Sequence, residues 1–139
     1  ELVSHKGQWA TIPQLYVADI DIENLMMTVK IESLEGGNIR LNSWTKYDVH
    51  HCSDGYTGSF DRPGKEVCFQ GRIEDIQHIL SNVSYHPPTR MINSDVISFI
   101  VTDNSYLGTS MISNESARIR IDVEIKEKSD QKLYAFSAM

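Results

Sequence analysis

The stretch Ala117-Arg-Ile-Arg-Ile-Asp-Val-Glu-Ile125 alternates apolar and charged residues without interruption. Successive side chains of a β-strand point to opposite faces, so this pattern predicts a strand with one face toward a core and one toward water. The expected core residues are Ile119, Ile121, Val123 and Ile125.

Short apolar runs separated by turn-forming residues predict further strands before this one. They cover Gln8–Pro13, with Trp9 and Ile12 inward, Leu25–Glu32, Ile39–Trp44, Val67–Gly71, Asn82–Tyr85 and Asp95–Thr102. Residues 73–80 differ, because their apolar side chains follow helical spacing and predict one short helix. About seven short strands in one chain favour an all-β fold, a Greek-key sandwich of two sheets of the immunoglobulin-like kind.

The length of 139 residues fits one domain, which we place at residues 7–125. Residues 126–139 then form a linker, the start of a next module or an appended tail, and the abrupt ends suggest a piece of a longer protein. The net charge of −6 argues against a nucleic-acid or anionic-membrane partner. The sequence has no apolar run long enough to insert into a membrane.

Cys52 and Cys68 flank a segment rich in turn-forming residues. An even cysteine count favours a disulfide in a secreted protein, whereas the alternative is two free thiols in an intracellular domain. Two N-glycosylation sequons begin at Asn82 and Asn114. Together these features favour the secretory pathway, with Asn114 as the better acceptor because its surroundings are polar.

Acidic side chains follow one strand-like segment and end another. Asp19, Asp21 and Glu23 alternate, so an extended chain would place them on one side, and Asp103 and Asn104 end the strand that begins at Asp95. Like charges at this spacing repel unless a cation lies among them, and Ca²⁺ prefers oxygen ligands. The alternative is a hydrated acidic turn whose carboxylates cap backbone amides.

The order of these pieces resembles the cadherin and cadherin-like repeats of extracellular proteins over about residues 7–125. Residues 17–24, Val-Ala-Asp-Ile-Asp-Ile-Glu-Asn, resemble the calcium-binding element, and the last two strands match the end of such a repeat. The middle resembles a divergent branch from large adhesion and matrix proteins, through Gly71, the helix, Tyr85-His86-Pro87 and Ser94-Asp95. This sequence lacks the Leu-Asp-Arg-Glu and Asp-x-Asn-Asp-Asn elements that complete the linked calcium sites of successive cadherin repeats.

The resemblance implies a non-catalytic adhesion or structural module of a larger surface or secreted protein, with Asp19 and Asp21 as a calcium-ligand pair. Its partners would be another protein or neighbouring modules of the same chain. Long loops in small domains are often functional, so we expect the aromatic residues of the loop after residue 44 to contact the partner or pack the loop. These residues are Trp44, Tyr47, Tyr56 and Phe60.

Other functions remain as alternatives. A carbohydrate-binding sandwich would use Trp44, Tyr47 and Tyr56 to stack on sugars, and an intracellular scaffold would keep its thiols free. A zinc site at His50, His51 and the cysteines lacks the usual ligand spacing. No nucleophile elbow, phosphate loop or acid-base pair indicates an enzyme.

Overall fold

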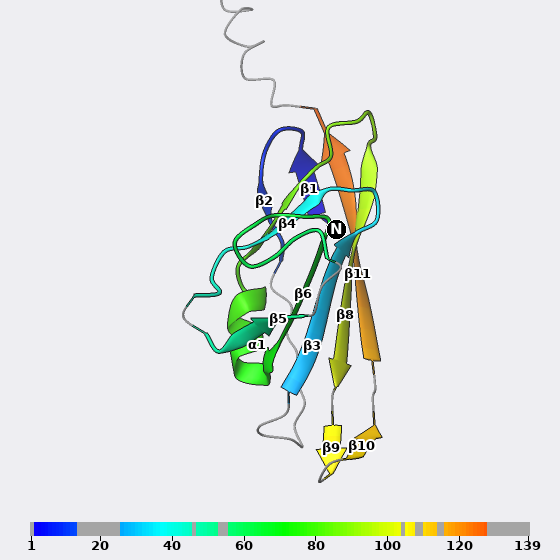
Figure 1. Cartoon of the computed structure of the whole chain (residues 1–139). Coiled ribbons are helices and arrows are strands. Elements are labelled where there is room, and N and C mark those ends of the chain that lie inside the picture. The colour runs from blue at the N-terminus through cyan, green and yellow to red at the C-terminus, as the bar shows by residue number, and fades with distance from the viewer. Residues whose placement is uncertain are drawn as a thin grey trace, which may run out of the picture.

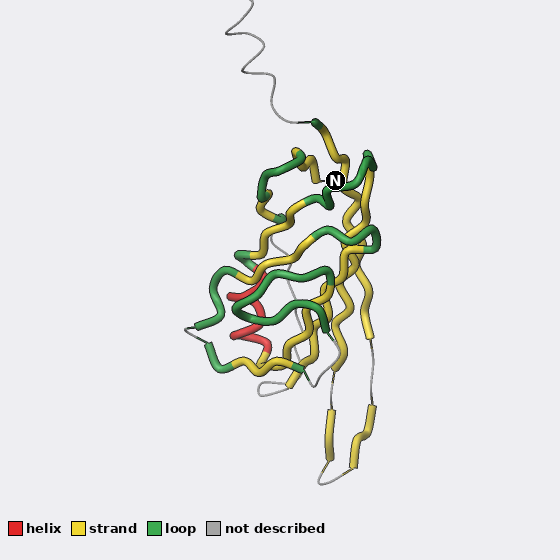
Figure 2. Tube along the Cα trace, turned by 45° about the horizontal axis from the view of Figure 1, so that its top comes forward, coloured by secondary structure: helices red, strands yellow, loops and turns green. Residues whose placement is uncertain are grey.

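A computed structural model gives the fold of the chain. It describes residues 2–13, 26–45, 47–52, 56–103, 105–107, 110–113 and 116–127, and the described residues from 103 to 116 by their backbone alone. Strands dominate this part of the chain, beside one short helix (Figures 1 and 2), so the all-β prediction is confirmed. The helix, α1 (Ile73–Leu80), has the predicted bounds.

The strands follow the chain from β1 to β11. They are β1 (Leu2–His5), β2 (Ala10–Thr11), β3 (Met26–Ser33), β4 (Asn38–Leu41), β5 (Val49–His51), β6 (Glu66–Arg72), β7 (Val83–His86), β8 (Ser94–Asp103), β9 (Ser105–Leu107), β10 (Ser110–Ser113) and β11 (Ser116–Lys126).

These strands form two main sheets. The larger sheet has the order β1-β11-β8-β3-β6-β5, and the smaller sheet has the order β2-β7-β4. Strands β9 and β10 form a separate two-stranded ribbon, which continues from β8 and leads to β11 at one end of the molecule (Figure 1). Among the described strands the pairs are antiparallel except β1 with β11, where the first and last strands run in parallel.

The core lies between the two sheets and is closed at one side by α1. β3 alternates between buried and partly exposed residues, as its sequence predicts, with Met27, Val29 and Ile31 buried. The smaller sheet contributes Ile39, Leu41, Val83 and Tyr85 to the core. The helix adds Ile76, Ile79 and Leu80, and its position against β6 follows from this apolar stripe.

The prediction that Trp9 points inward is wrong, because 37% of this residue is exposed. Ile12 is buried as expected. The two residues are three positions apart, and an extended chain places residues at odd separations on opposite faces. Both side chains could therefore not point inward from one regular strand.

The prediction that Ile119 is a core residue is also wrong. It lies on the core side of the β11 alternation, but 39% of it is exposed. β1 pairs only with residues 123–126 of β11, so it does not flank the half of β11 that carries Ile119. Strands β1 and β5 were not foreseen either. Both are short strands at the edges of the larger sheet, and β1 also depends on a partner at the other end of the described chain.

Candidate functional site

The acidic segments of the calcium prediction lie mostly outside the described residues. This holds for Asp19, Asp21, Glu23 and Asn104, and Asp103 is described only as the last residue of β8. The register nevertheless pairs Met27 with Asp103, and β3 begins at Met26, three positions after Glu23. The end of β8 therefore lies beside the strand that follows the first acidic segment. Within the described part of the chain, no group of three metal-ligating side chains is found.

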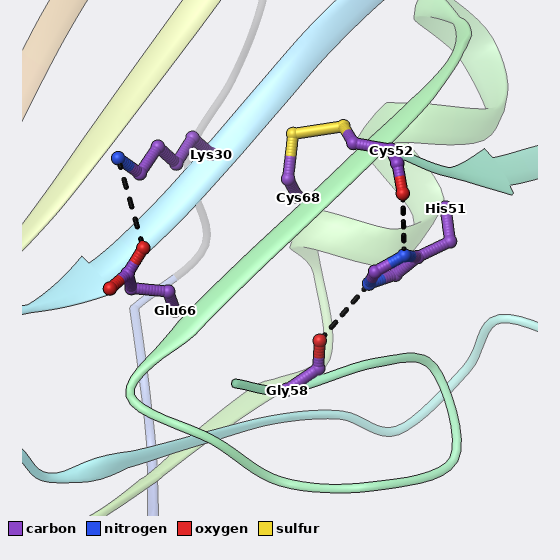
Figure 3. Close-up of a disulfide and its surroundings, with 6 residues drawn as sticks. All are labelled: Lys30, His51, Cys52, Gly58, Glu66 and Cys68. Carbon is purple, nitrogen blue, oxygen red and sulfur yellow. Dashed lines mark hydrogen bonds and ion pairs between the residues drawn. A yellow bond between two sulfur atoms is a disulfide. The ribbon is translucent and has the colours of Figure 1, made fainter. Parts of the chain in front are cut away.

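The predicted disulfide joins Cys52 to Cys68, with the two Cα atoms 5.3 Å apart. β5 pairs with β6 so that His51 lies opposite Phe69, and one residue further Cys52 lies opposite Cys68 and donates its N–H to the Cys68 carbonyl. The bond therefore fixes the register of this edge hairpin (Figure 3). Both sulfur atoms are used in it, so the zinc alternative loses the two thiolates that it needs.

The aromatic residues of the long loop pack on one another and on the core. Trp44 stacks on Phe60 with 5.1 Å between ring centroids, and Phe60 lies 6.3 Å from Phe69 of β6. Tyr47 stacks on His78 of the helix, with ring centroids 4.8 Å apart. Trp44, Tyr47 and Phe60 are thus partly buried against the core, so the loop is held on the sandwich through them.

Tyr56 has a different position from the other loop aromatics. The Lys30 ammonium lies 5.9 Å from its ring centroid, and Lys30 also forms ion pairs with Glu32 and Glu66. Lys30 belongs to the face of β3 opposite the core residues Val29 and Ile31, so Tyr56 lies toward the outer face of the larger sheet.

His51 connects the disulfide to the loop that follows it. Its ring nitrogens lie 2.8 Å from the Cys52 carbonyl oxygen and 3.0 Å from the Gly58 carbonyl oxygen (Figure 3). Carbonyl oxygens only accept hydrogen bonds, so both contacts are hydrogen bonds when both nitrogens carry a proton.

Asp61 lies in the same loop. A hydrogen bond donated by the Ser59 hydroxyl lowers the pKa of the exposed Asp61 carboxyl below its usual value.

A buried polar cluster links the two sheets and was not recognised as such from the sequence. Asp95, only 3% exposed, accepts hydrogen bonds from the Tyr85 hydroxyl and the Ser33 hydroxyl. Its other oxygen accepts from the backbone N–H groups of Glu35 and Val96. The signal was present in the sequence, because alternation places Asp95 on the same face of its strand as the core residue Ile97.

Tyr85 is fully buried beneath this cluster. Desolvation by burial, and then the hydrogen bond to Asp95, raise the pKa of its hydroxyl far above the ordinary value. The hydrogen bond between Tyr85 and Asp95 therefore joins β7 to the start of β8.

The outer face of the smaller sheet carries an aromatic and cationic pair that sequence reasoning missed. The Arg40 guanidinium lies 4.0 Å from the Trp9 ring centroid, and the His86 ring lies 5.1 Å from it on the same side. The sequence signal for the exposed Trp9 was the two-residue alternation around β2, which turns this side chain away from the core.

The glycosylation candidate Asn82 is exposed directly before β7, whereas Asn114 lies outside the described residues.

No helix in the described residues has the length and apolar character needed to cross a membrane. Comparisons with protein-family models, curated proteins and solved structures find no match to this chain.

Proposed function

We propose that this chain is a non-catalytic extracellular module of a larger surface or secreted protein, which contacts a protein partner or neighbouring modules. The disulfide between Cys52 and Cys68 carries the proposal, because such bonds persist in oxidising compartments and are rare in the cytosol. The function is binding through a rigid sandwich rather than chemistry on a substrate.

The strand order supports the immunoglobulin- and cadherin-like Greek-key type. Immunoglobulin-like sandwiches place strands B, E and D in one sheet and C, F and G in the other. If β2, β3, β4, β7, β8 and β11 are matched to B through G, the observed orders β2-β7-β4 and β3-β8-β11 are both reproduced. The hairpin β5–β6 and helix α1 are then additions at the edge beside β3.

The surface that we assign to partner binding is formed by the aromatic residues of the long loop, Trp44, Tyr47, Tyr56 and Phe60. Trp44 and Tyr47 each give a ring face to a neighbouring side chain, Phe60 and His78. This packing holds the Trp44 and Tyr47 side chains in place, which reduces the entropy lost when a partner binds them. It also leaves less free ring surface for sugar stacking, so we favour a protein partner over the carbohydrate-binding alternative.

The compartment can be tested on the native protein. An antibody against this module should stain intact, non-permeabilised cells or detect the protein in the medium, and Cys52 and Cys68 should resist alkylation until a reductant is added. Staining that needs permeabilisation, with both thiols alkylated directly, would favour the intracellular scaffold.

Calcium is the proposed cofactor of the pole where β8 ends and β3 begins. We expect about 1 mM calcium, a typical concentration for extracellular modules, to raise the thermal midpoint by several degrees. Asp19→Ala and Asp103→Ala should remove the rise, and Asp48→Ala, in the exposed loop, should keep it. An unchanged midpoint in the wild type would discard calcium but not the module.

A further inference from the structure

The outer face of the smaller sheet consists of polar side chains and one tryptophan. Alternation turns Ile39, Leu41, Val83 and Tyr85 toward the core. The residues that alternate with them point outward. We name this surface the polar face, and it includes Trp9, Arg40, Asn42, Asn82, Ser84 and His86. Trp9 keeps 37% of its surface exposed on this face, although the Arg40 guanidinium and the His86 ring lie against it.

We infer that the polar face holds an N-linked glycan attached to Asn82, whose inner sugars lie along β7 and rest on Arg40 and Trp9. This inference rests on the proposed extracellular function, because the sugar is added in the secretory pathway. It commits to a glycan of the chain itself, since the sequon Asn82-Val83-Ser84 begins on this face.

Asn82 is placed as an acceptor requires. It is exposed, and its amide nitrogen donates one hydrogen bond, to the Ser43 hydroxyl at 2.8 Å. An amide nitrogen carries two hydrogens, so one N–H is left for substitution. In the transfer, Nδ2 bonds to C1 of the first sugar of a lipid-linked diphosphate oligosaccharide, the C1–O bond to the diphosphate breaks, and Nδ2 loses one proton.

The Asn82 amide oxygen also has a partner, the Asn42 side-chain amide at 3.2 Å. Asn42 receives a hydrogen bond from Arg40 Nε at 2.9 Å. These bonds fix the acceptor side chain over the sheet, so the first sugar starts from a defined direction.

The outward residues of β7 lead from Asn82 toward Arg40 and Trp9. Outward residues of a strand repeat about every 6.6 Å, so Ser84 lies one repeat from Asn82, and His86 lies two repeats away. Ser84 pairs across the sheet with Arg40, and the Trp9 ring lies beside His86. A short chain of linked sugar rings can span this distance. Sugar C–H faces pack on an indole ring, and sugar hydroxyls accept hydrogen bonds from a guanidinium.

The burial of the Ser84 hydroxyl, which is part of the sequon, determines when the sugar can be attached. Ser84 is only 6% exposed, and its hydroxyl accepts a hydrogen bond from Asn42 at 2.8 Å. An enzyme that must bind both Asn82 and Ser84 therefore acts on the nascent chain, before β7 is packed in the folded sheet. Protein secreted from eukaryotic cells is the proper sample.

The test uses cells that make only high-mannose glycans and a chain that carries Asn114→Gln, so that Asn82 is the remaining acceptor. Peptide mass spectrometry should find Asn82 occupied. Trimming to a single sugar with an endoglycosidase, which leaves Asn82 as an amide, should lower the thermal midpoint by about 3 °C. Trp9→Ala and Arg40→Gln should each remove most of this difference, and Met91→Ser, at an 86% exposed position outside the polar face, should keep it.

Two outcomes overturn the inference and leave the proposed function standing: an unoccupied Asn82 in secreted protein with its disulfide intact, or an equal trimming effect in the wild type and in Trp9→Ala. Free thiols at Cys52 and Cys68 in the native protein would instead overturn the proposed function. If Trp9→Ala fails to fold, acrylamide quenching in a Trp44→Phe chain replaces it. Trimming should then increase the quenching of Trp9, and unchanged quenching would overturn the inference.

Discussion

Asp95 is the residue at which the two sheets and the β3–β4 turn meet. Its carboxylate accepts hydrogen bonds from Ser33 in β3, from Tyr85 in β7 and from two backbone N–H groups. A buried carboxylate is tolerated only with such partners, and each partner would in turn be left unsatisfied without it. A single acid therefore fixes the relative position of three elements.

We predict that Asp95→Ala lowers the free energy of unfolding by about 3 kcal/mol, because it leaves several buried donors without an acceptor. Tyr85→Phe removes one donor and should cost about 1 kcal/mol. Urea unfolding at pH 7 measures both changes, with Asp61→Ala at the surface as the control. Equal small effects of all three substitutions would contradict the role of the cluster.

The raised pKa of the Tyr85 hydroxyl predicts a pH dependence. A group whose pKa is higher in the folded state than in the unfolded state stabilises the fold below the unfolded value, and this stability is lost as the pH rises above it. The unfolded value for tyrosine is about 10, so the wild type should lose up to about 1.4 kcal/mol per pH unit above pH 10 from this group. Tyr85→Phe should lack that part of the slope, which urea unfolding between pH 8 and 11 would reveal; identical slopes would argue against it.

At the scale of elements, the turn between β3 and β4 depends on two adjacent glycines for different reasons. Gly36 has a φ of +92°, a conformation that favours glycine, and a Cβ added there would meet only open space. A Cβ at Gly37 would lie 2.5 Å from Cε1 of Tyr85. The first residue is needed for its backbone and the second for the tyrosine packed on it.

We expect Gly37→Ala to lower the free energy of unfolding by about 2–3 kcal/mol, because Tyr85 must move away from Asp95. Gly36→Ala should cost about 1 kcal/mol, from its backbone alone. Thermal and urea unfolding compare the pair. A larger loss for Gly36→Ala would show that the contact with Tyr85 does not govern this turn.

The edge hairpin β5–β6 depends on its disulfide, because β5 has only three residues and pairs on one side within the described residues. Replacing both cysteines by serine should lower the free energy of unfolding by about 3 kcal/mol, the loop-closure contribution of a ring of this length. Amide hydrogen exchange should increase first in residues 49–52. Protection that stays unchanged there would mean that packing by Phe60 is sufficient.

At the scale of the whole molecule, β1 joins the two ends of the described chain. Leu2 pairs with Val123 and is 9% exposed, whereas its neighbour Val3 points outward and is 42% exposed. The first strand is therefore part of the larger sheet, although it precedes residue 7, where the sequence pattern predicts that the domain begins.

Leu2→Ser should cost about 2 kcal/mol of unfolding free energy, through lost burial, and Val3→Ser less than about 0.5 kcal/mol. Urea unfolding of the two variants checks the difference between matched neighbours. Similar small effects would place β1 outside the cooperatively folding unit.

Local sequence patterns were sufficient to predict the structure where the signal lies within one segment. The alternation in β3, the helical spacing in α1 and the cysteine pair around one loop each predicted what the structure contains. The reason is that strand and helix periodicity decide which side chains share a face before any tertiary contact forms.

Tertiary structure alone decided how these segments are combined. The parallel pairing of β1 with β11, the contact of Arg40 with Trp9 and the meeting of Asp95 with Tyr85 depend on contacts between residues distant in the sequence. Short edge strands and buried polar groups gain their stability from such partners, and a local pattern does not contain them. The sequence by itself thus determined the all-β class, the helix and the disulfide, and the packed sheets determined which polar residues are buried and which surface is presented.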